Sequence, residues 1–345
     1  MFKAVESTLC GHPHKVCDQI AEAIVDEYLR RDPQARVDIN VLASHGMLVI
    51  GGEVLSQADF DCSLLAKQLY QEIGYPDDME VFVSLEKPSE RMQSSKGSLD
   101  TVVVHGYATR ETREFLPRPV VYAHAIARRL DDLRKIDPRF RWLGPDGKIQ
   151  VVMEGKHLRR VTVLVQHPDK TLPHHLQSHL LNEVIIPLVG ENGTTILINP
   201  LGGFTVGGFV ADTGCSGQMS HVDFYGGLIP HGTASPIGKD PHRAERAGAL
   251  MARFVAKDLV QKKQLDAVVV SLMYGIGELE PSFIDVRAMG SSETSEELLT
   301  FVRQEYVFHL DAIVDQLTLV KPWYRSAAVY GMFGNESFPW EMKKS

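Results

Sequence analysis

Apolar and polar positions repeat along the chain with two periods, one helical and one extended. In the segment 15–31, apolar residues including Val16, Ile20, Ile24 and Tyr28 recur at spacings of three and four, which places them on one face of a helix. Asp32-Pro33 ends this segment. We expect further helices at 59–73, 118–133, 174–188 and 243–259, and one that begins at Ser295.

Alternating apolar and polar residues predict the strands. The segments 37–50 and 51–55 alternate in this way, with Gly46 near a turn. Strand pairs mix with single helices about three times, and regular β-α-β alternation is missing. The sequence therefore predicts an α+β fold of antiparallel sheets with helices on one face. The other expected strands are 148–153, 160–166, 194–199, 204–206, 266–271 and 282–286.

Composition narrows the classes of function. The chain has 345 residues and a formal net charge of −8, so we expect neither a nucleic-acid partner nor an anionic membrane partner. The longest apolar runs are too short to cross a bilayer, and the first residues lack the apolar core of a secretion signal. We expect a cytoplasmic globular protein that meets any anionic substrate with local positive charge. Its cysteines, Cys10, Cys17, Cys62 and Cys215, show no C-x-x-C spacing.

The start of the first predicted helix carries His12, His14 and Lys15 beside Gly11 and Pro13. Free backbone N–H groups and the helix dipole make a helix N-terminus receptive to anions. A histidine or lysine there can stabilise charge on a phosphate leaving group. The alternative, which these five residues alone favour, is a Gly-Pro helix entry with solvated histidines.

A second candidate is the small-residue loop 231–240, in which Lys239 precedes the next predicted helix. Such a loop suits phosphate oxygens. It is not a Walker A loop, because five residues separate Gly232 from Gly238 and Asp240 stands where Ser or Thr would bind Mg²⁺. A plain Gly/Pro loop is an equal alternative.

Several carboxylates are candidates, although each alone is more typical of a solvated surface residue. Asp146 and Lys148 are two residues apart on one strand and can face one pocket. Asp212 lies in a glycine-rich stretch where backbone can approach a ligand, and Phe204 fits either the core or stacking on a base. The polar segment 86–100 is a candidate mobile lid. The other candidates are Glu6, Glu53, Asp100 and Glu245.

Taken in order, these motifs resemble the methionine adenosyltransferases, also called S-adenosylmethionine synthetases. The resemblance covers nearly the whole chain and includes ESTLCGHPHKVCDQIAEAIVD, HGYATRET, WLGPDGKIQV, GGFTVGGFVADTG, GKDPHRAERAGALMARFVAK and FGNESFPWE. It implies three similar repeats in a pseudo-threefold arrangement, which we place at 1–100, 101–206 and 207–345 with segments interleaved in space. It also implies a homodimer, or a tetramer, with active sites at the subunit interface.

The family joins methionine to ATP: the thioether sulfur attacks C5′ of the ribose and displaces triphosphate, which is then hydrolysed. This chemistry needs alignment of the reactants and neutralisation of a strongly anionic leaving group. The resemblance implies His12 at the bridging oxygen, with Lys148 and Lys239 at the phosphates, as the catalytic set. For substrate binding it implies Glu6 and Asp146 near the nucleoside, Phe204 on adenine, Glu53 and Asp100 at the methionine amino group, and Lys15, Asp212, Gly238 and Arg243 in the rest of the site.

Several positions depart from the family pattern. His14 replaces a Mg²⁺-binding aspartate, and the second acidic metal position is Glu245. Because Mg²⁺ prefers oxygen ligands, we expect Mg²⁺ or another divalent cation, held more weakly by this pair. Asn40 replaces an alkali-ion glutamate, so we expect the K⁺ site to be lost. Gln218 and Met219 replace an arginine and a lysine at the triphosphate.

Three functions follow from this pattern. The first is an adenosyltransferase that transfers the adenosyl group of ATP to methionine or a related nucleophile and releases triphosphate. The second is a non-catalytic nucleotide-binding paralogue or a partner subunit of a true synthetase, which the lost charges favour. The third is a variant that does not hydrolyse triphosphate. The retained His12, Lys148, Lys239, Glu53 and Asp100 favour the first.

Overall fold

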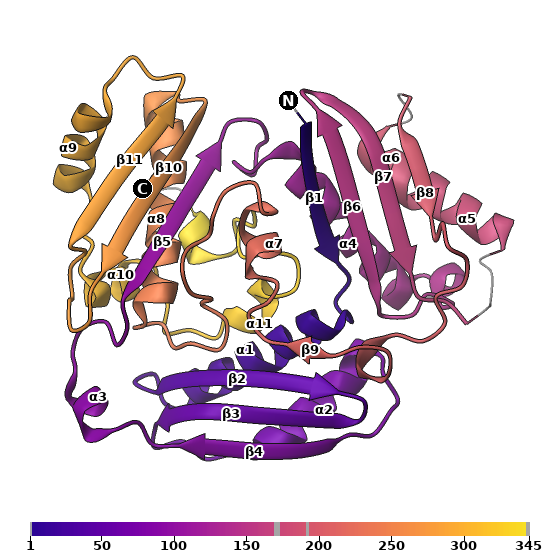
Figure 1. Ribbon diagram of the computed structural model, residues 1–345, viewed down its shortest axis with the longest axis horizontal. Helices are drawn as coiled ribbons and strands as arrows, with labels where there is room; N and C mark the ends of the chain where they lie inside the picture. Colours follow the sequence, from indigo (N-terminus) through magenta and orange to yellow (C-terminus); the bar gives the residue numbers. More distant parts are fainter. Residues whose placement is uncertain (1, 169–172, 191–192, 343–345) are drawn as a thin grey trace.

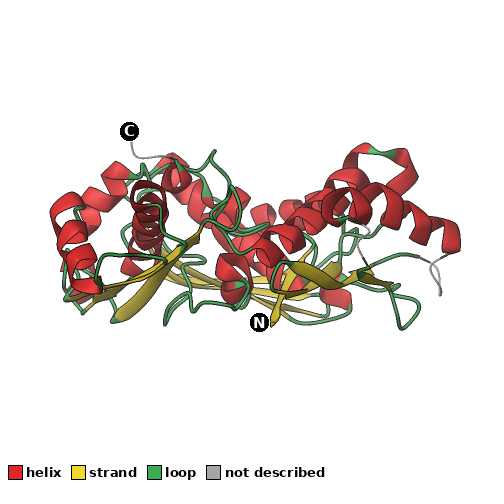
Figure 2. Cartoon of the chain, turned by 90° about the horizontal axis from the view of Figure 1, so that it is seen from above, coloured by secondary structure: helices red, strands yellow, loops and turns green. Residues whose placement is uncertain are grey.

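The computed structural model describes residues 2–168, 173–190 and 193–342. Three sheets surround a central group of helices and loops (Figure 1). Seen from above, the helices cover one side of the strands (Figure 2). The mixed α+β prediction with mostly antiparallel sheets is confirmed, since two strand pairs are parallel and the rest are antiparallel.

The first sheet has the strand order β4-β3-β2-β9. A tight turn joins β2 to β3, and its residues His45 and Gly46 both have positive φ, at 44° and 86°. The pairing of β3 with β4 is parallel. The elements are β2 (Arg36–Ser44), β3 (Met47–Leu55), β4 (Glu80–Glu86) and β9 (Gly214–Cys215), with helices α1 (Pro13–Arg31) and α2 (Cys62–Ile73).

The second sheet has the order β1-β6-β7-β8 and packs on the long helix α4. The helix predicted at 174–188 is helical through its length, but a π turn interrupts it at Leu181–Ile185. The elements are β1 (Phe2–Thr8), β6 (Gly147–Glu154), β7 (His157–Val165), β8 (Thr195–Ile198), α4 (Arg118–Ile136), α5 (His174–Leu180) and α6 (Ile186–Val189).

The third sheet has the order β11-β10-β5 and packs on α8. Its elements are β5 (Val102–Thr109), β10 (Ala267–Tyr274), β11 (Phe283–Met289), α8 (Ala244–Lys263), α9 (Ser295–Glu305) and α10 (Leu310–Gln316). The remaining elements are short: α3 (Glu90–Ser94), α7 (Ser220–Tyr225), α11 (Tyr324–Ala327) and the 3₁₀ turns Pro138–Phe140, Gly208–Val210 and Pro339–Glu341. The strand predicted at 204–206 was wrong, because these residues form a loop.

Each sheet takes one strand from a distant part of the chain. The N-terminal strand β1 pairs with β6, β5 pairs with β10, and β9 pairs with β2. Relative to the proposed repeats, the first lends a strand to the second, the second to the third and the third to the first. The boundaries of these repeats stay a prediction.

The two faces of the sheets differ. In β2 the side chains of Val37, Ile39, Val41 and Ala43 are buried against the helices, whereas those between them are partly or fully exposed on the opposite face, which we call the open face. Large apolar side chains also lie on this face. They are Phe2, Leu42, Met47, Phe82, Leu164, Met273, Phe283 and Met289.

A buried ion pair joins helices α1 and α8. Arg246 of α8 pairs with Glu22 of α1 at 2.7 Å, and both side chains are fully buried. The Arg246 guanidinium also lies 3.9 Å from the centre of the Tyr324 ring. Such a pair is costly to break, because the remaining charge is left buried. It therefore holds the start of α8 against the middle of α1. Within the described residues, no helix combines the length and apolar composition needed to span a membrane.

Candidate active site

Many of the predicted site residues gather in two groups, each near the N-terminus of a long helix. We call the first the α1 cluster: His12, His14, Asp146, Lys148 and Asp212. The second, the α8 cluster, consists of the predicted Lys239, Arg243 and Glu245 together with Asp38, which was not predicted. Neither N-cap residue, His12 in α1 or Arg243 in α8, makes a side-chain cap hydrogen bond. Both helices therefore leave N–H groups of the first turn available to an anion.

Close approach of two loops builds the α1 cluster. The Gly11 N–H donates to the Pro145 carbonyl at 3.0 Å, and a Cβ at Gly11 would lie 2.6 Å from that oxygen. Only glycine allows this approach, which brings the start of β6 beside the start of α1. Pro13 at the first helical position is already set for the helical φ. The sequence thus fixes His12 next to the strand that carries Lys148.

His12 is a neutral imidazole over the physiological range. Burial, together with the charges of Lys148 and Lys15 and the nearby His14, lowers the pKa of His12 to about 3. Its ring centre lies 5.5 Å from that of His14. Its Nδ1 is buried and has no hydrogen-bond partner among the described residues. A buried polar atom without a partner is unusual in a folded protein, and it distinguishes His12 from the paired residues around it.

His14 has one ring nitrogen already committed. The backbone N–H of Cys215 in β9 donates to His14 Nδ1 at 3.0 Å. Burial lowers the pKa of His14, although the negative charge of Asp212 partly opposes this effect. A neutral imidazole that accepts at Nδ1 carries its proton on Nε2. His14 therefore presents an N–H donor to the site, where a carboxylate would present an acceptor.

The carboxylates of the α1 cluster have different environments. Asp146 is buried, and burial raises its pKa to about 6. Its Oδ2 accepts the Gly208 N–H at 2.9 Å. Asp212 is exposed and accepts the Thr213 N–H at 2.7 Å. Lys148 on the open face of β6 pairs with Glu6 of β1 at 2.8 Å.

Lys15 is placed differently from the other cations. Its side chain is only 1% exposed, and its ammonium group pairs with Asp223 and, at 3.7 Å, with Asp18. Its charge acts on His12 through space, since it contributes to the lowered pKa of that histidine. In this structure Lys15 is a buried support of the α1 cluster and is not brought to the open face.

Phe204 lies in the loop that follows β8, and its ring is partly exposed. Its carbonyl accepts the His167 N–H at 2.8 Å. The nearby Phe209 is buried and stacks on Tyr70, with ring centres 5.0 Å apart. Of the two rings, Phe204 is the one that a base can reach.

The α8 cluster is held on β2 by its backbone. Lys239 forms an isolated antiparallel bridge with Asp38, and the Ile39 N–H donates to the Gly238 carbonyl at 2.8 Å. Gly238 has a φ of 78°, and a Cβ there would lie 1.9 Å from the Ile39 carbonyl oxygen. This position therefore requires glycine.

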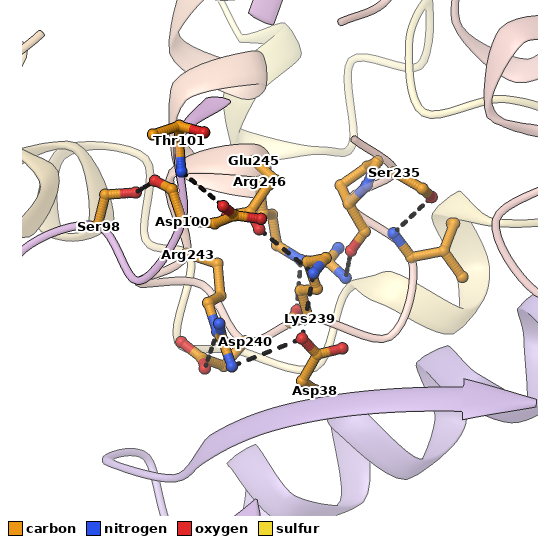
Figure 3. Close-up of polar contacts among 12 residues, drawn as sticks. Asp38, Ser98, Asp100, Thr101, Ser235, Lys239, Asp240, Arg243, Glu245 and Arg246 are labelled. Carbon is orange, nitrogen blue, oxygen red and sulfur yellow. Dashed lines mark hydrogen bonds and ion pairs between the residues drawn. The ribbon is translucent and has the colours of Figure 1, made fainter. Parts of the chain in front are cut away.

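The side chains of the α8 cluster are ion-paired with one another, as Figure 3 shows. Lys239 Nζ lies 3.1 Å from Asp38 Oδ2 and 3.2 Å from Glu245 Oε1. Arg243 Nη2 lies 3.6 Å from Asp38 Oδ2, and Arg243 Nε lies 3.7 Å from Asp240. The formal charges of the four cluster residues, two positive and two negative, sum to zero.

Glu53 lies directly opposite Asp38 across the β2–β3 pair. It lines a cavity of about 180 Å³ beside Arg36, Arg243 and the segment 88–99. Asp100 is exposed, does not line this cavity and accepts the Thr101 N–H at 2.7 Å. The structure therefore does not bring Asp100 to the cavity that Glu53 lines.

The predicted lid has some local structure. Residues 90–94 form α3, which Ser89 caps. The side-chain amide of Gln93 in this helix donates to the Pro88 carbonyl at 2.6 Å. Ser98 is buried and exchanges backbone hydrogen bonds with Glu278 and Gly277. The segment thus lies over the Glu53 cavity with one end fixed, and its opening stays a prediction.

The two clusters lie at different places along β2. The α8 cluster contacts the strand at Asp38, whereas β9, whose Cys215 holds His14, pairs with it at Leu42. Four residues of β-strand span about 13 Å. One chain therefore presents two separate clusters.

Of the two predicted metal ligands, only Glu245 fits a divalent cation. Its side chain is 1% exposed and neither oxygen accepts a hydrogen bond within the described residues, although Oε1 is ion-paired with Lys239 at 3.2 Å. A hard cation prefers such a carboxylate oxygen. His14 does not fit, because its Nδ1 accepts from Cys215 and its Nε2 carries a proton. The described part of the chain contains no group of three or more metal-ligating side chains.

Comparison with known proteins decides the family. Three protein-family domain models match consecutive parts of the chain: the S-adenosylmethionine synthetase N-terminal domain at 1–90, the central domain at 95–204 and the C-terminal domain at 206–342. The chain belongs to the S-adenosylmethionine synthetase family. The three matched domains agree with the three sheets.

Relatives within the S-adenosylmethionine synthetase family are similar over nearly the full length. The S-adenosylmethionine synthase of Sorangium cellulosum is 37% identical over 97% of this chain and 86% of its own length. The S-adenosylmethionine synthase of Aquifex aeolicus is 33% identical over 99% and 96%, and that of Salinibacter ruber is 36% identical over 97% and 94%.

Two findings were not predicted from the sequence. Asp38 was not selected, yet it contacts both cations of the α8 cluster. The alternation of β2 places Asp38 on the open face, but no local pattern points to its partners, Lys239 and Arg243, which are about 200 residues away along the chain. The second finding concerns Gln218 and Met219, the two positions at which the family pattern has a cation. Gln218 is exposed, whereas Met219 is buried, with a relative exposure of 5%.

Proposed function

We propose that this protein transfers the adenosyl group of ATP to the sulfur of methionine and releases triphosphate. The observation that carries the proposal is the match of all three family domains, together with two uncapped helix N-termini on one face of the molecule. The reaction needs positioned donors for the leaving triphosphate and little covalent participation by the protein.

The α1 cluster would act at the ribose and its leaving oxygen. A neutral His12 can donate an N–H to the bridging oxygen as negative charge develops there. His14 Nε2–H adds a second donor, and Lys148 and Asp212 complete this end of the site. Asp146 and Phe204, with Glu6, would hold the nucleoside.

The α8 cluster would hold the rest of the triphosphate. Lys239 and Arg243 supply positive charge, and Gly238 keeps the loop backbone close to β2. Glu53 and Asp100 would bind the methionine amino group. Since Asp100 does not line the Glu53 cavity of its own chain, we propose that the two carboxylates of one site come from different subunits.

The open face suits a homodimer, which would bring the α1 cluster of one copy to the α8 cluster of the other. Its large exposed apolar side chains support this assembly, since exposed apolar surface of this extent marks interaction sites. A tetramer would be built from two such dimers. We place the protein in the cytoplasm.

The family generally uses Mg²⁺ and K⁺. Glu245 would hold a divalent cation, which when bound neutralises triphosphate charge, whereas His14 would not. We propose that the K⁺ site is lost, because an amide at Asn40 supplies no negative charge. The Asn40 Nδ2 instead lies 3.4 Å from Asp38 Oδ1, to which it donates.

One assay tests the proposal. The purified protein is incubated with ATP, Mg²⁺ and methionine, and S-adenosylmethionine, triphosphate, pyrophosphate and phosphate are measured by mass spectrometry and ion chromatography. We expect S-adenosylmethionine with triphosphate or its hydrolysis products. ATP binding with no product would instead indicate a non-catalytic paralogue, and accumulation of uncleaved triphosphate would indicate a variant without the hydrolysis step.

A further inference from the structure

Asp38 occupies the place where the loop before α8 crosses β2. One oxygen of its carboxylate, Oδ2, lies 3.1 Å from Lys239 Nζ and 3.6 Å from Arg243 Nη2 (Figure 3). These are the two cations of the α8 cluster that the proposed function assigns to triphosphate. Both are already in contact with an anion that belongs to the protein.

The backbone around Asp38 keeps its carboxylate in this position. A Cβ at Gly52 of β3 would lie 1.9 Å from the Asp38 carbonyl oxygen, and one at Gly238 would lie 1.9 Å from that of Ile39. Two glycines therefore let the neighbouring strand and loop close on β2 from both sides. The side chains of Asp38 and Lys239 stay 23% and 18% exposed, so a ligand on the open face can reach both.

Each of the two cations also has a second acid partner besides Asp38. Glu245 already pairs with Lys239 at 3.2 Å, and Asp240 lies 3.7 Å from Arg243 Nε. Asp240 is fully buried and also accepts the Val37 N–H at 2.9 Å, so it is part of the fold. Asp38 is thus the acid that can leave Lys239 and Arg243 while the helix start stays intact.

We propose that Asp38 is a specificity-determining residue, a tethered carboxylate that competes with the polyphosphate for Lys239 and Arg243. The inference rests on the proposed function, which makes triphosphate the ligand. Because a tethered group has an effective concentration on the order of millimolar or higher, a small anion that meets only one of the two cations does not displace it. A triphosphate that contacts both cations does, and Asp38 re-forms its ion pairs when triphosphate or its products leave.

Binding of inorganic phosphates to the full-length protein tests this inference without turnover. Triphosphate and orthophosphate are titrated separately by calorimetry at low salt, without divalent cations, into wild type, Asp38→Asn and Asp38→Ala. Removing a like charge from the site should tighten triphosphate binding about tenfold in both variants. Orthophosphate binding should become measurable only in the variants. Glu86→Gln, which removes an exposed carboxylate opposite Glu53 in the same sheet, is the matched control and should not change binding.

The outcomes separate this inference from the proposed function. Equal triphosphate affinity in wild type and Asp38→Asn would overturn the competition and leave the synthetase proposal standing. Weaker binding in Asp38→Asn would also overturn it, since Asp38 would then support the ligand. No triphosphate binding by any of the proteins would overturn the proposed phosphate site itself. In a Lys239→Met background, the increase in triphosphate affinity caused by Asp38→Asn should fall below threefold. An undiminished increase would contradict competition between Asp38 and triphosphate for Lys239.

Discussion

The two clusters share an architecture and differ in electrostatics. Each lies at the uncapped N-terminus of a helix of 19 or 20 residues that packs under a sheet. In the α1 cluster the imidazoles are neutral, and His12 Nδ1 is unpartnered within the described chain. In the α8 cluster Lys239 and Arg243 both contact carboxylates. A ligand therefore meets uncharged imidazoles at the first and must exchange ion pairs at the second.

Removing the His12 side chain tests the first half of this comparison and has the largest expected effect. Loss of one preorganised donor to a developing oxyanion lowers kcat by about 10² to 10³. We expect His12→Ala to show this loss in steady-state kinetics with little change in the KM for methionine. A variant that keeps kcat and raises only KM would show that His12 binds the substrate without acting at the leaving oxygen.

Lys239→Met tests whether the α8 cluster depends on balanced charge. It leaves Glu245 buried without its ion-pair partner, so we expect a loss of about 3 kcal/mol in the free energy of unfolding in urea at pH 7. Adding Glu245→Gln should restore most of this stability but not triphosphate binding. If the double variant is no more stable than Lys239→Met, the loss has another cause.

Asp146 should make the free energy of unfolding depend on pH. Burial raises its folded-state pKa from 3.8 to about 6, so the folded state binds the proton more tightly than the unfolded state. Its contribution to stability is therefore largest below pH 4 and is lost as pH rises toward 6. By linkage the loss is about 2 to 3 kcal/mol for a shift of this size. Urea unfolding of wild type and Asp146→Asn from pH 4 to 7 measures it as a difference, and parallel curves would contradict the assignment.

Substitution of His14 should have the smallest effect, on ATP binding, and it distinguishes the roles of the two ring nitrogens. His14→Asn keeps an acceptor for the Cys215 N–H but removes the outer donor, whereas His14→Gln places an amide donor further out. Because one neutral hydrogen bond contributes about 1 kcal/mol, we expect His14→Asn to weaken ATP binding about fivefold and His14→Gln to weaken it less. Calorimetry with Mg·ATP measures both, and the reverse order would show that the inner contact dominates.

The sequence predicted the long elements well, because their signals are local. The apolar spacing in α1 and the alanine-rich stretch of α8 give a helical period, and both helices formed within a few residues of the prediction. The turn expected near Gly46 is confirmed, since β2 and β3 meet at His45-Gly46, but the strand boundary expected near residue 50 was too late. The short strands β1, β4 and β5 were not predicted, because their stability comes from pairing with distant strands.

The site was less accessible to sequence reasoning. Its motifs located the two helix N-termini, but the motif that contains Lys15 does not show that its ammonium turns inward to Asp223. The contact of Asp38 with Lys239 depends on an extra bridge at the edge of β2 that no local pattern encodes. The roles assigned to the individual site residues stay predictions.

The exchange of edge strands has a consequence for synthesis of the chain. On the ribosome β2, β3 and β4 emerge early, but β9, which pairs with β2, follows only at Gly214. Until then that edge of the first sheet is unpaired, and an exposed edge can recruit other chains. Pairing of such distant segments also slows folding. A nascent chain halted before Gly214 should therefore aggregate more readily than the finished protein, and chaperones that cover β-edges should act in this interval.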